Sequence, residues 1–219
     1  MKNKLIIISI CAFIVMLTAG CMQSSSNTAE EVCTALSDKY GEEFQAVSIG
    51  DRIDTNHSKL YVHPISNEEV LFTAVIDDNT GKITDNYIVE TVNLQIKDKL
   101  KENCKKKGIE TEARVMAITR NGLEINTNKK HSPESFMKEY DLNNYLVYLI
   151  AKQNDITTEE IKEVIKKTEE ELNIKMLVVG YILDEGYDEC SEEMKKYPEI
   201  SKTMIESYNP VASFDYIPI

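Results

Sequence analysis

Apolar runs of strand length alternate with helical segments that carry start signals, and this alternation constrains the fold most. Thr28 and Thr157 each precede a helical pattern and are followed three residues later by glutamate, as in a capping box. Ser132-Pro133 places proline at the first position of another helix. Hairpin-like strands early in the chain and alternation later are typical of an α+β protein. We expect a mixed or antiparallel sheet covered by helices, in the order α-β-β-β-α-β-β-α-β-α-β-α-β.

The expected helices share an apolar period near 3.6 and lie at 29–40, 86–107, a short stretch from 132, 157–172 and 188–208. The expected strands share β-branched and aromatic runs between turn residues and lie at 44–49, 59–63, 70–76, 112–119, 123–127, 145–151, 174–183 and 211–217. Asn121-Gly122, between two of these runs, predicts a β-hairpin. The run 70–76 is apolar on both faces, which predicts a central strand.

The first twenty-one residues have the pattern of an export signal. Two lysines precede an apolar run, 5–17, that is too short to span a membrane comfortably as a mature helix. The motif Thr18-Ala19-Gly20-Cys21 follows, and it resembles the lipobox of a bacterial lipoprotein signal. The resemblance implies cleavage after Gly20 and a lipid on Cys21. The alternative is an ordinary secretory signal with an incidental cysteine.

These features divide the chain into a signal peptide at 1–20, a lipidated cysteine with a flexible tether at 21–28, and an α+β globular domain at 29–219. A polar stretch leaves open a division of that domain into two lobes near 127–132. Removing residues 1–20 removes two lysines and no acid, so that 23 basic and 37 acidic residues leave a formal net charge of −14. This strong negative charge argues against nucleic acid as a partner, because binding to phosphate groups needs a basic surface. The expected partners are the membrane, through the lipid on Cys21, and an unidentified protein.

Three cysteines remain after the lipid site, so at most one intramolecular disulfide can form. Cys33 and Cys104 both lie on apolar faces of expected helices. Buried free thiols are the simpler interpretation, and a Cys33–Cys104 disulfide is the alternative. Neither the cysteines nor the histidines have the spacing of a metal site, and no cofactor motif is found.

Ser135-x-x-Lys138 matches the nucleophile pair of penicillin-recognising enzymes. That chemistry also needs Lys-Thr-Gly on a facing strand, and Lys202-Thr203 is followed instead by Met204 in an expected helix. We therefore expect Ser135 to belong to the first turn of its helix and Lys138 to face solvent.

Other candidate groups have simpler structural interpretations. The histidines lack the spacing of a triad or a two-histidine metal site and are expected to be exposed and isolated; they are His57, His63 and His131. Asp77-x-Asn79-x-Gly81 resembles the start of a calcium loop, but Lys82 and Ile88 stand where such a loop needs glycine and glutamate. We expect a turn there, with Thr84 or Asp85 capping the helix that follows.

Two charge clusters coincide with expected helix ends, where the helix dipole favours such charges. The acidic cluster, which could also bind a cation or a basic partner, comprises Asp184, Glu185, Asp188, Glu189, Glu192 and Glu193. The basic cluster, which could also touch lipid headgroups, comprises Lys97, Lys99, Lys101, Lys105, Lys106 and Lys107.

Within residues 36–87, the segments 36–44, 61–64 and 84–87 are similar to a pattern in small uncharacterised lipoproteins of Gram-positive bacteria. This resemblance implies anchoring outside the cell and no particular activity. The sequence thus favours a membrane-anchored, extracytoplasmic binding module without catalysis. The alternatives are an immunity- or inhibitor-type lipoprotein that neutralises a basic toxin or protease, and a small hydrolase. Cys21 is the one residue to which a role is assigned.

Overall fold

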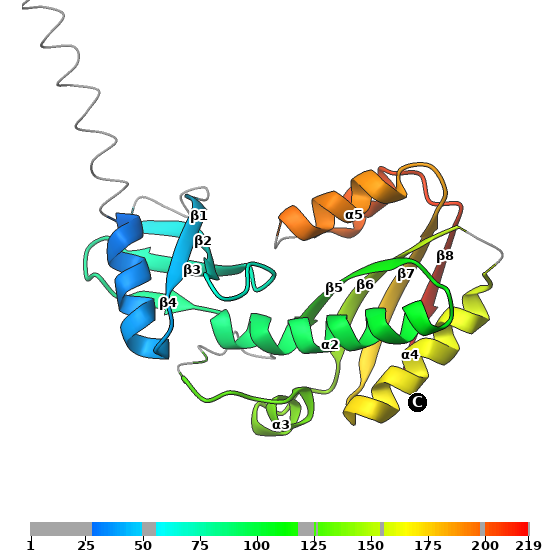
Figure 1. The fold of residues 1–219 in the computed structure, drawn as a ribbon, viewed down its shortest axis with the longest axis horizontal. Coiled ribbons are helices and arrows are strands. Elements are labelled where there is room, and N and C mark those ends of the chain that lie inside the picture. Colours follow the sequence, from blue (N-terminus) through cyan, green and yellow to red (C-terminus); the bar gives the residue numbers. More distant parts are fainter. Residues whose placement is uncertain are drawn as a thin grey trace, which may run out of the picture. The chain divides into compact units, whose positions relative to one another are not determined.

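The computed structural model describes residues 28–49, 56–117, 125, 127–153, 156–197 and 200–218. These residues form two compact units (Figure 1). The described residues of the first unit lie within 28–68 and 73–84, and those of the second within 69–72 and 85–218. Two four-stranded sheets with helices beside them confirm the expected α+β class.

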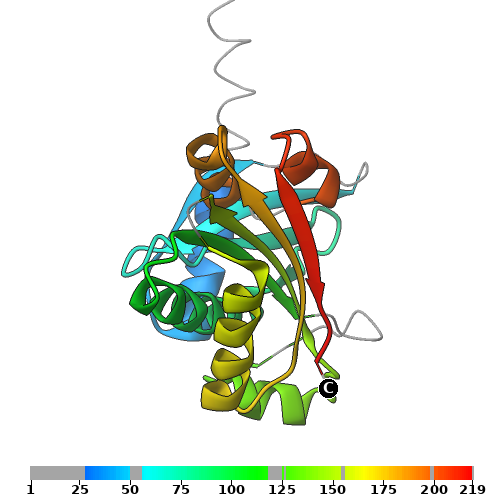
Figure 2. The ribbon, with the colours of Figure 1, turned by 90° about the vertical axis from the view of Figure 1, so that its right-hand side faces the viewer.

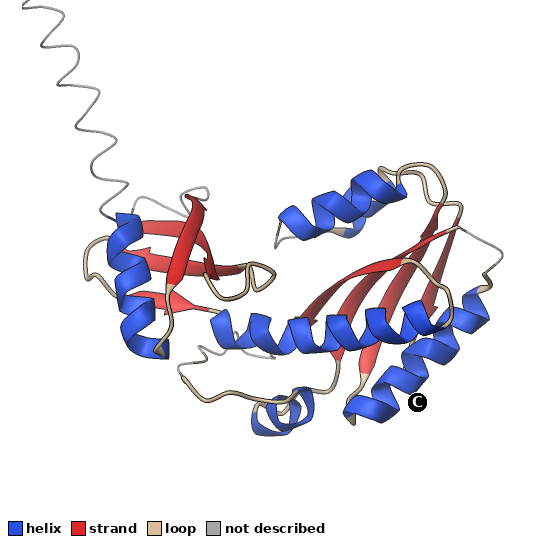
Figure 3. Ribbon diagram, in the orientation of Figure 1, coloured by secondary structure: helices blue, strands red, loops and turns tan. Residues whose placement is uncertain are grey.

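The first unit combines one helix with a four-stranded sheet (Figure 3). The helix covers residues 28–40 of the described chain. The strands, in their order across the sheet, are β1 (Phe44–Ile49), β2 (His57–Pro64), β3 (Phe72–Asp77) and β4 (Ile83–Asp85). β1 and β2 are antiparallel. The Cys33 thiol on the helix hydrogen-bonds to the backbone of Ala46, so the helix lies against β1.

The second unit builds its sheet in the order β5-β6-β7-β8. Its strands are β5 (Thr111–Ala117), β6 (Tyr145–Lys152), β7 (Met176–Leu183) and β8 (Ala212–Tyr216). Its helices are α2 (Tyr87–Lys106), α3 (Pro133–Glu139), α4 (Thr158–Leu172), α5 (Tyr187–Lys196) and α6 (Lys202–Glu206). The central pair β6–β7 is parallel and both outer pairs are antiparallel. A parallel pair needs a crossover, and α4 supplies it.

Side chains that alternate along the strands pack against helices on both faces of this sheet. On one face, Ile150, Tyr181 and Leu183 form a buried cluster with α5 and α6. On the other, the Glu169 carboxylate of α4 accepts hydrogen bonds from the Met176 N–H and the Tyr216 hydroxyl, at 2.6 Å each. Figure 2 shows α4 in front of the sheet and β8, in red, at its outer edge.

β8 is held close to β7 by one glycine. Gly180 pairs with Phe214 in the register of the two strands. A Cβ atom at Gly180 would lie 2.1 Å from Cζ of the Phe214 ring. The absence of a side chain at Gly180 therefore leaves room for the outer end of the Phe214 ring beside the β7 backbone.

The expected helix at 188–208 is wrong as a single element, because the chain leaves the helix after Lys196. Tyr197 has extended dihedral angles, with φ −114° and ψ 127°. Tyr197 precedes Pro198, and a residue before proline disfavours the helical conformation. A second short helix, α6, then begins after Ser201, whose side chain accepts a hydrogen bond from the Met204 N–H.

The two units divide near residues 69–85, and residues 127–132 lie within the second unit. The Asn121-Gly122 turn lies outside the described residues, and Ile125 and Thr127 are not in a strand. The third expected strand does lie inside its sheet, between β2 and β4.

The signal, the lipobox with Cys21 and most of the tether lie outside the described residues. None of the helices in the described ranges combines the length and the apolar composition that a membrane span needs.

Candidate functional site

A small polar pocket lies in the second unit, where α2, β5 and α5 meet. It has a volume of about 30 Å³. Its lining combines charged, amide and apolar side chains: Glu69, Leu71, Glu90, Asn93, Leu94, Lys97, Ala113, Arg114, Val115, Met194 and Lys195. A single water needs roughly 10–15 Å³, so the polar pocket has room for one or two waters or for a small chemical group.

Beside the polar pocket, β5 carries a buried carboxylate that is held by two lysines of α2. The Glu112 side chain is 1% exposed, and its oxygens lie 2.8 Å from Lys101 Nζ and 3.3 Å from Lys97 Nζ. The backbone N–H of Ala113 also donates to it, at 3.0 Å. Burial alone would raise the pKa of Glu112, but both lysines and this N–H together hold it below its ordinary value.

The second buried carboxylate is that of Glu90, where the effect of burial on the pKa outweighs that of the nearby positive charge. Glu90 of α2 accepts from Arg114 Nη2 of β5 at 3.0 Å and from Asn86 Nδ2 at 3.2 Å. Burial raises the pKa of Glu90, and the favourable charge of Arg114 only partly offsets it. A carboxyl group with a raised pKa in a pocket is a frequent property of functional sites.

Two residues that line the polar pocket each carry a buried polar atom that has no hydrogen-bond partner among the described residues. The atoms are Oδ1 of Asn93, a residue that is 4% exposed, and Nε of Arg114. None of the described lining residues is a serine, threonine, cysteine or histidine. The acidic, basic and amide side chains of the lining can accept and donate hydrogen bonds.

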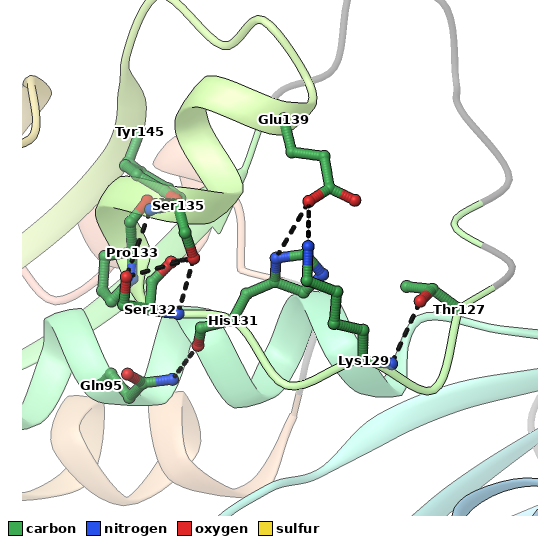
Figure 4. Close-up of polar contacts among 9 residues, drawn as sticks. All are labelled: Gln95, Thr127, Lys129, His131, Ser132, Pro133, Ser135, Glu139 and Tyr145. Atoms are coloured by element: carbon green, nitrogen blue, oxygen red, sulfur yellow. Dashed lines mark hydrogen bonds and ion pairs between the residues drawn. The ribbon is translucent and has the colours of Figure 1, made fainter.

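Figure 4 shows the first turn of α3, where Ser135 has the structural role expected from the sequence. The Ser132 N–H donates to Ser135 Oγ at 2.9 Å, and Ser135 Oγ–H donates to the Ser132 carbonyl at 3.0 Å. The first of these bonds forms a capping box together with the bond from the Ser135 N–H to Ser132 Oγ at 3.2 Å. Lys138 Nζ lies 2.5 Å from Glu134, with its side chain 72% exposed. The expectation that Ser135 belongs to the first turn of its helix and that Lys138 faces solvent is confirmed.

Changing Ser135 to alanine should therefore cost only the capping interaction, about 1 kcal/mol of unfolding free energy. Urea denaturation followed by circular dichroism measures this loss. Lys138→Ala is the matched surface control and should change stability by less than about 0.5 kcal/mol. We expect no covalent labelling of Ser135 by a fluorescent penicillin. Stoichiometric acylation at Ser135 would instead establish a catalytic serine.

The expectation that all three histidines are exposed is wrong for two of them. His131 is buried, and its imidazole packs edge-on against the rings of Phe136 and Tyr140. Its Nδ1 lies 3.8 Å from Glu139 Oε2, and neither ring nitrogen makes a hydrogen bond (Figure 4). His63 is also buried, at the end of β2, with Nδ1 3.0 Å from the Pro64 carbonyl.

The loop at 77–81 is a hydrogen-bonded turn, as expected. Asp77 Oδ1 accepts from the N–H groups of Asn79 and Thr80, at 2.9 and 3.1 Å. Those bonds, the Asn79 N–H first, hold the pKa of Asp77 below its ordinary value. At the start of α2, Asp85 Oδ1 accepts from the Tyr87 N–H at 3.1 Å. The N-cap residue is Asn86, not Thr84 or Asp85 as expected, and its side chain makes no capping hydrogen bond. Across the described ranges, no group of three histidine, cysteine or acidic side chains is placed to hold a metal.

Residues of both charge clusters lie at helix ends or form ion pairs within the fold. Lys105 and Lys106 lie in the last turn of α2, and Asp188 and Glu189 lie in the first turn of α5, as the dipole argument predicts. Cluster members also form ion pairs: Lys99 Nζ of the basic cluster lies 3.1 Å from Glu171, and Asp188 of the acidic cluster lies 3.1 Å from Lys152 Nζ. The basic cluster therefore stabilises α2 through pairing as well as through the dipole.

Cys33, Cys104 and Cys190, the three described cysteines, are free thiols. The Cys33–Cys104 disulfide that the sequence left open is therefore not formed. Cys104 and Cys190 are buried and Cys33 is half-buried. Burial raises the pKa of all three thiols, to about 11 for Cys104 and Cys190. These thiols are therefore poorly reactive near neutral pH.

The fold of this chain is similar to that of a solved protein structure. The chain is similar to a crystal structure of a DUF5037 family protein from Ruminococcus gnavus ATCC 29149. The TM-score is 0.62 over 85% of this chain and 89% of that chain, with 15% sequence identity. No protein-family model and no curated protein matches the sequence. At this identity the likeness concerns the α+β fold alone.

Sequence reasoning did not single out the polar pocket. Its key residues are distant in sequence, with Glu90 and Asn93 on α2 and Arg114 on β5. One signal was present: Glu112 and Arg114 place opposite charges two residues apart on one face of an expected strand. Recognising the pocket also required the placement of α2 beside β5, which spacing along the chain does not supply.

Proposed function

We propose that this protein is a lipoprotein anchored at the extracytoplasmic face of the cell membrane, where its folded part acts as a non-catalytic binding module. The observation that carries the proposal is the Thr18-Ala19-Gly20-Cys21 motif after a basic and apolar leader. The strongly negative mature chain would not be attracted to an anionic membrane, so the lipid supplies the anchoring. Two acyl chains hold a protein stably, whereas one binds only marginally.

Binding rather than catalysis is supported by the chemistry of the polar pocket. Its lining combines hydrogen-bonding side chains, among them Glu90, Asn93 and Arg114, with apolar ones. A hydrolase would need a nucleophile or an activated water within hydrogen-bond reach of a base. The small volume, about 30 Å³, also suits recognition of one chemical group better than enclosure of a substrate.

Changing Cys21 to serine tests the anchor. The variant should incorporate no palmitate analogue, because the thiol that carries the lipid is gone. Its electrophoretic mobility should differ from that of the wild-type protein. Metabolic labelling of cells and gel analysis of the membrane fraction measure both. Cys11→Ser is the matched control, because Cys11 lies in the leader that is removed, and its labelling should equal that of the wild type. A Cys21→Ser protein that stays in the membrane fraction with unchanged mobility would contradict the proposal.

A second candidate is an immunity- or inhibitor-type lipoprotein that neutralises a basic toxin or protease at the cell surface. The formal net charge of −12 for the whole chain favours it, because opposite charges accelerate the encounter with a basic partner. Exposed carboxylates at the start of α5, Glu185 and Glu189, contribute to this surface.

Crosslinking on intact cells at low and high salt distinguishes this candidate. We expect the captured partner to be basic and the yield to fall as salt rises, because salt screens exposed charges. Glu185→Gln with Glu189→Gln should lower the yield at low salt, and the surface variant Lys138→Ala should not. An acidic partner, or capture that is insensitive to salt, would exclude the neutralising role.

A further inference from the structure

We propose that β8 is the interaction surface for a second copy of this chain, which adds its own β8 in the antiparallel direction and joins two sheets into one. β8 is the last strand of its sheet, and none of the described strands pairs with its outer edge (Figure 2). An open edge presents backbone N–H and C=O groups with which another strand can pair. The inference goes beyond the membrane-anchored role and does not depend on it, because it rests on β8 and the residues at its ends.

The first argument is the apolar surface at both ends of β8. Val211 lies just before the strand and is 56% exposed, and Ile217 lies just after it and is 71% exposed. Among the described residues, Ile217 is the most exposed large apolar side chain. Contact with a second chain would remove both side chains from water, which favours association.

The second argument is the symmetry of the sequence about Phe214. The segment 210–218 has the sequence PVASFDYIP, so that Val211 and Ile217 lie three residues on either side of Phe214. Two copies that pair antiparallel about Phe214 therefore place Val211 opposite Ile217 of the second copy, and this contact forms twice. Pro210 and Pro218 lie symmetrically outside these positions. Proline cannot donate a backbone hydrogen bond, so the pairing ends at both prolines.

The third argument is that the polar side chains favour the same register. With Phe214 at the centre, the exposed Ser213 lies opposite the exposed Asp215 of the second copy, and a hydroxyl can donate to a carboxylate. A centre at Asp215 would oppose two carboxylates, and a centre at Ser213 would oppose Asp215 to Val211. A slip of one residue would bring side chains of opposite faces together. The strand is therefore complementary to a copy of itself in one register.

Cysteine crosslinking of the full-length protein, purified in detergent, tests this register. Directly opposite residues of an antiparallel pair have Cα atoms about 4.5–5.5 Å apart, which a disulfide can bridge. A mixture of Ser213→Cys and Asp215→Cys proteins should therefore give a disulfide-linked dimer on oxidation. Each variant alone should give much less, because its new cysteines lie diagonally, beyond the reach of a disulfide.

Oxidised wild-type protein gives the background from the native thiols, and mass spectrometry identifies the linked positions. A mixture that yields no more dimer than either variant alone would overturn the proposal.

Two double variants test association without a crosslink, by energy transfer between two labelled pools in an excess of detergent micelles. Val211→Asp with Ile217→Asp opposes like charges at both ends and should weaken association at least about tenfold. Val211→Lys with Ile217→Asp opposes unlike charges and should restore it. Val47→Asp, at a residue of β1 that is 58% exposed, is the matched control and should have no effect.

The salt dependence separates this dimer from capture of a basic partner. Both copies are strongly acidic, so their association should strengthen as salt rises, whereas binding of a basic protein should weaken. A chain that stays monomeric at every concentration, or a dimer that the paired aspartates do not weaken, would show that β8 is not the contact.

Discussion

Replacing Glu112 with glutamine is expected to lower the free energy of unfolding of the second unit by about 2 kcal/mol at pH 7. Glutamine has nearly the same shape, but it removes the charge that Lys97 and Lys101 hold at 3.3 and 2.8 Å. Because the Glu112 side chain is 1% exposed, water cannot replace these contacts without local opening. Urea denaturation followed by circular dichroism measures the loss.

The pH dependence gives this prediction a second readout. The pKa of Glu112 is lowered in the folded state, so its contribution to stability is present above the ordinary carboxyl pKa and is lost as pH falls through the lowered value. The glutamine variant should therefore lose less stability than the wild type on acidification from pH 7. Equal acid sensitivity of the two proteins would contradict the assignment of Glu112 as a stabilising buried anion.

Glu90→Gln is the matched control with the opposite sign. Burial raises the pKa of Glu90, so this group stabilises the fold most when protonated, below its ordinary pKa. That contribution is lost as pH rises through the raised value. Glutamine imitates the protonated form, so this variant should be at least as stable as the wild type at pH 7. The two variants thus separate a carboxylate that stabilises the fold from one that the fold tolerates.

The sequence predicted those elements whose ends carry side-chain signals. Thr157 and Glu160 form the expected capping box, and Ser132 caps α3 as Pro133 indicated. The short strand β4 was not predicted, because three residues carry too little periodicity. The break between α5 and α6 was missed although Pro198 marks it, because the apolar period continues past the proline.

The polar pocket was less predictable than the fold. Lys97 and Lys101 were interpreted as part of a basic helix end, and their spacing on α2 gave no sign of a common partner. That partner, Glu112, lies on β5 beyond the turn that follows α2. Ion pairs between elements depend on tertiary placement, whereas caps depend on residues three apart. The local pattern therefore predicted the caps and left the pocket undetected.

Replacing Gly180 with alanine is expected to lower the unfolding free energy of the second unit by about 1–3 kcal/mol. The added Cβ would lie 2.1 Å from Cζ of Phe214, far inside van der Waals contact. Either the ring leaves its position, where the residue is 9% exposed, or β8 moves away from β7. Urea denaturation measures the cost, and Ser213→Ala, an exposed change on β8, is the control that should have little effect.

A double-mutant cycle shows whether the cost comes from this contact. In a Phe214→Ala background the ring is absent, so the further change of Gly180 to alanine should cost close to nothing. The Phe214→Ala change is itself destabilising, because it removes the apolar cover of the β7 backbone. The cycle therefore compares the two Gly180 effects and not the absolute stabilities. Equal costs of Gly180→Ala in both backgrounds would mean that the glycine serves the β7 backbone rather than the ring, and that β8 is not positioned by this packing.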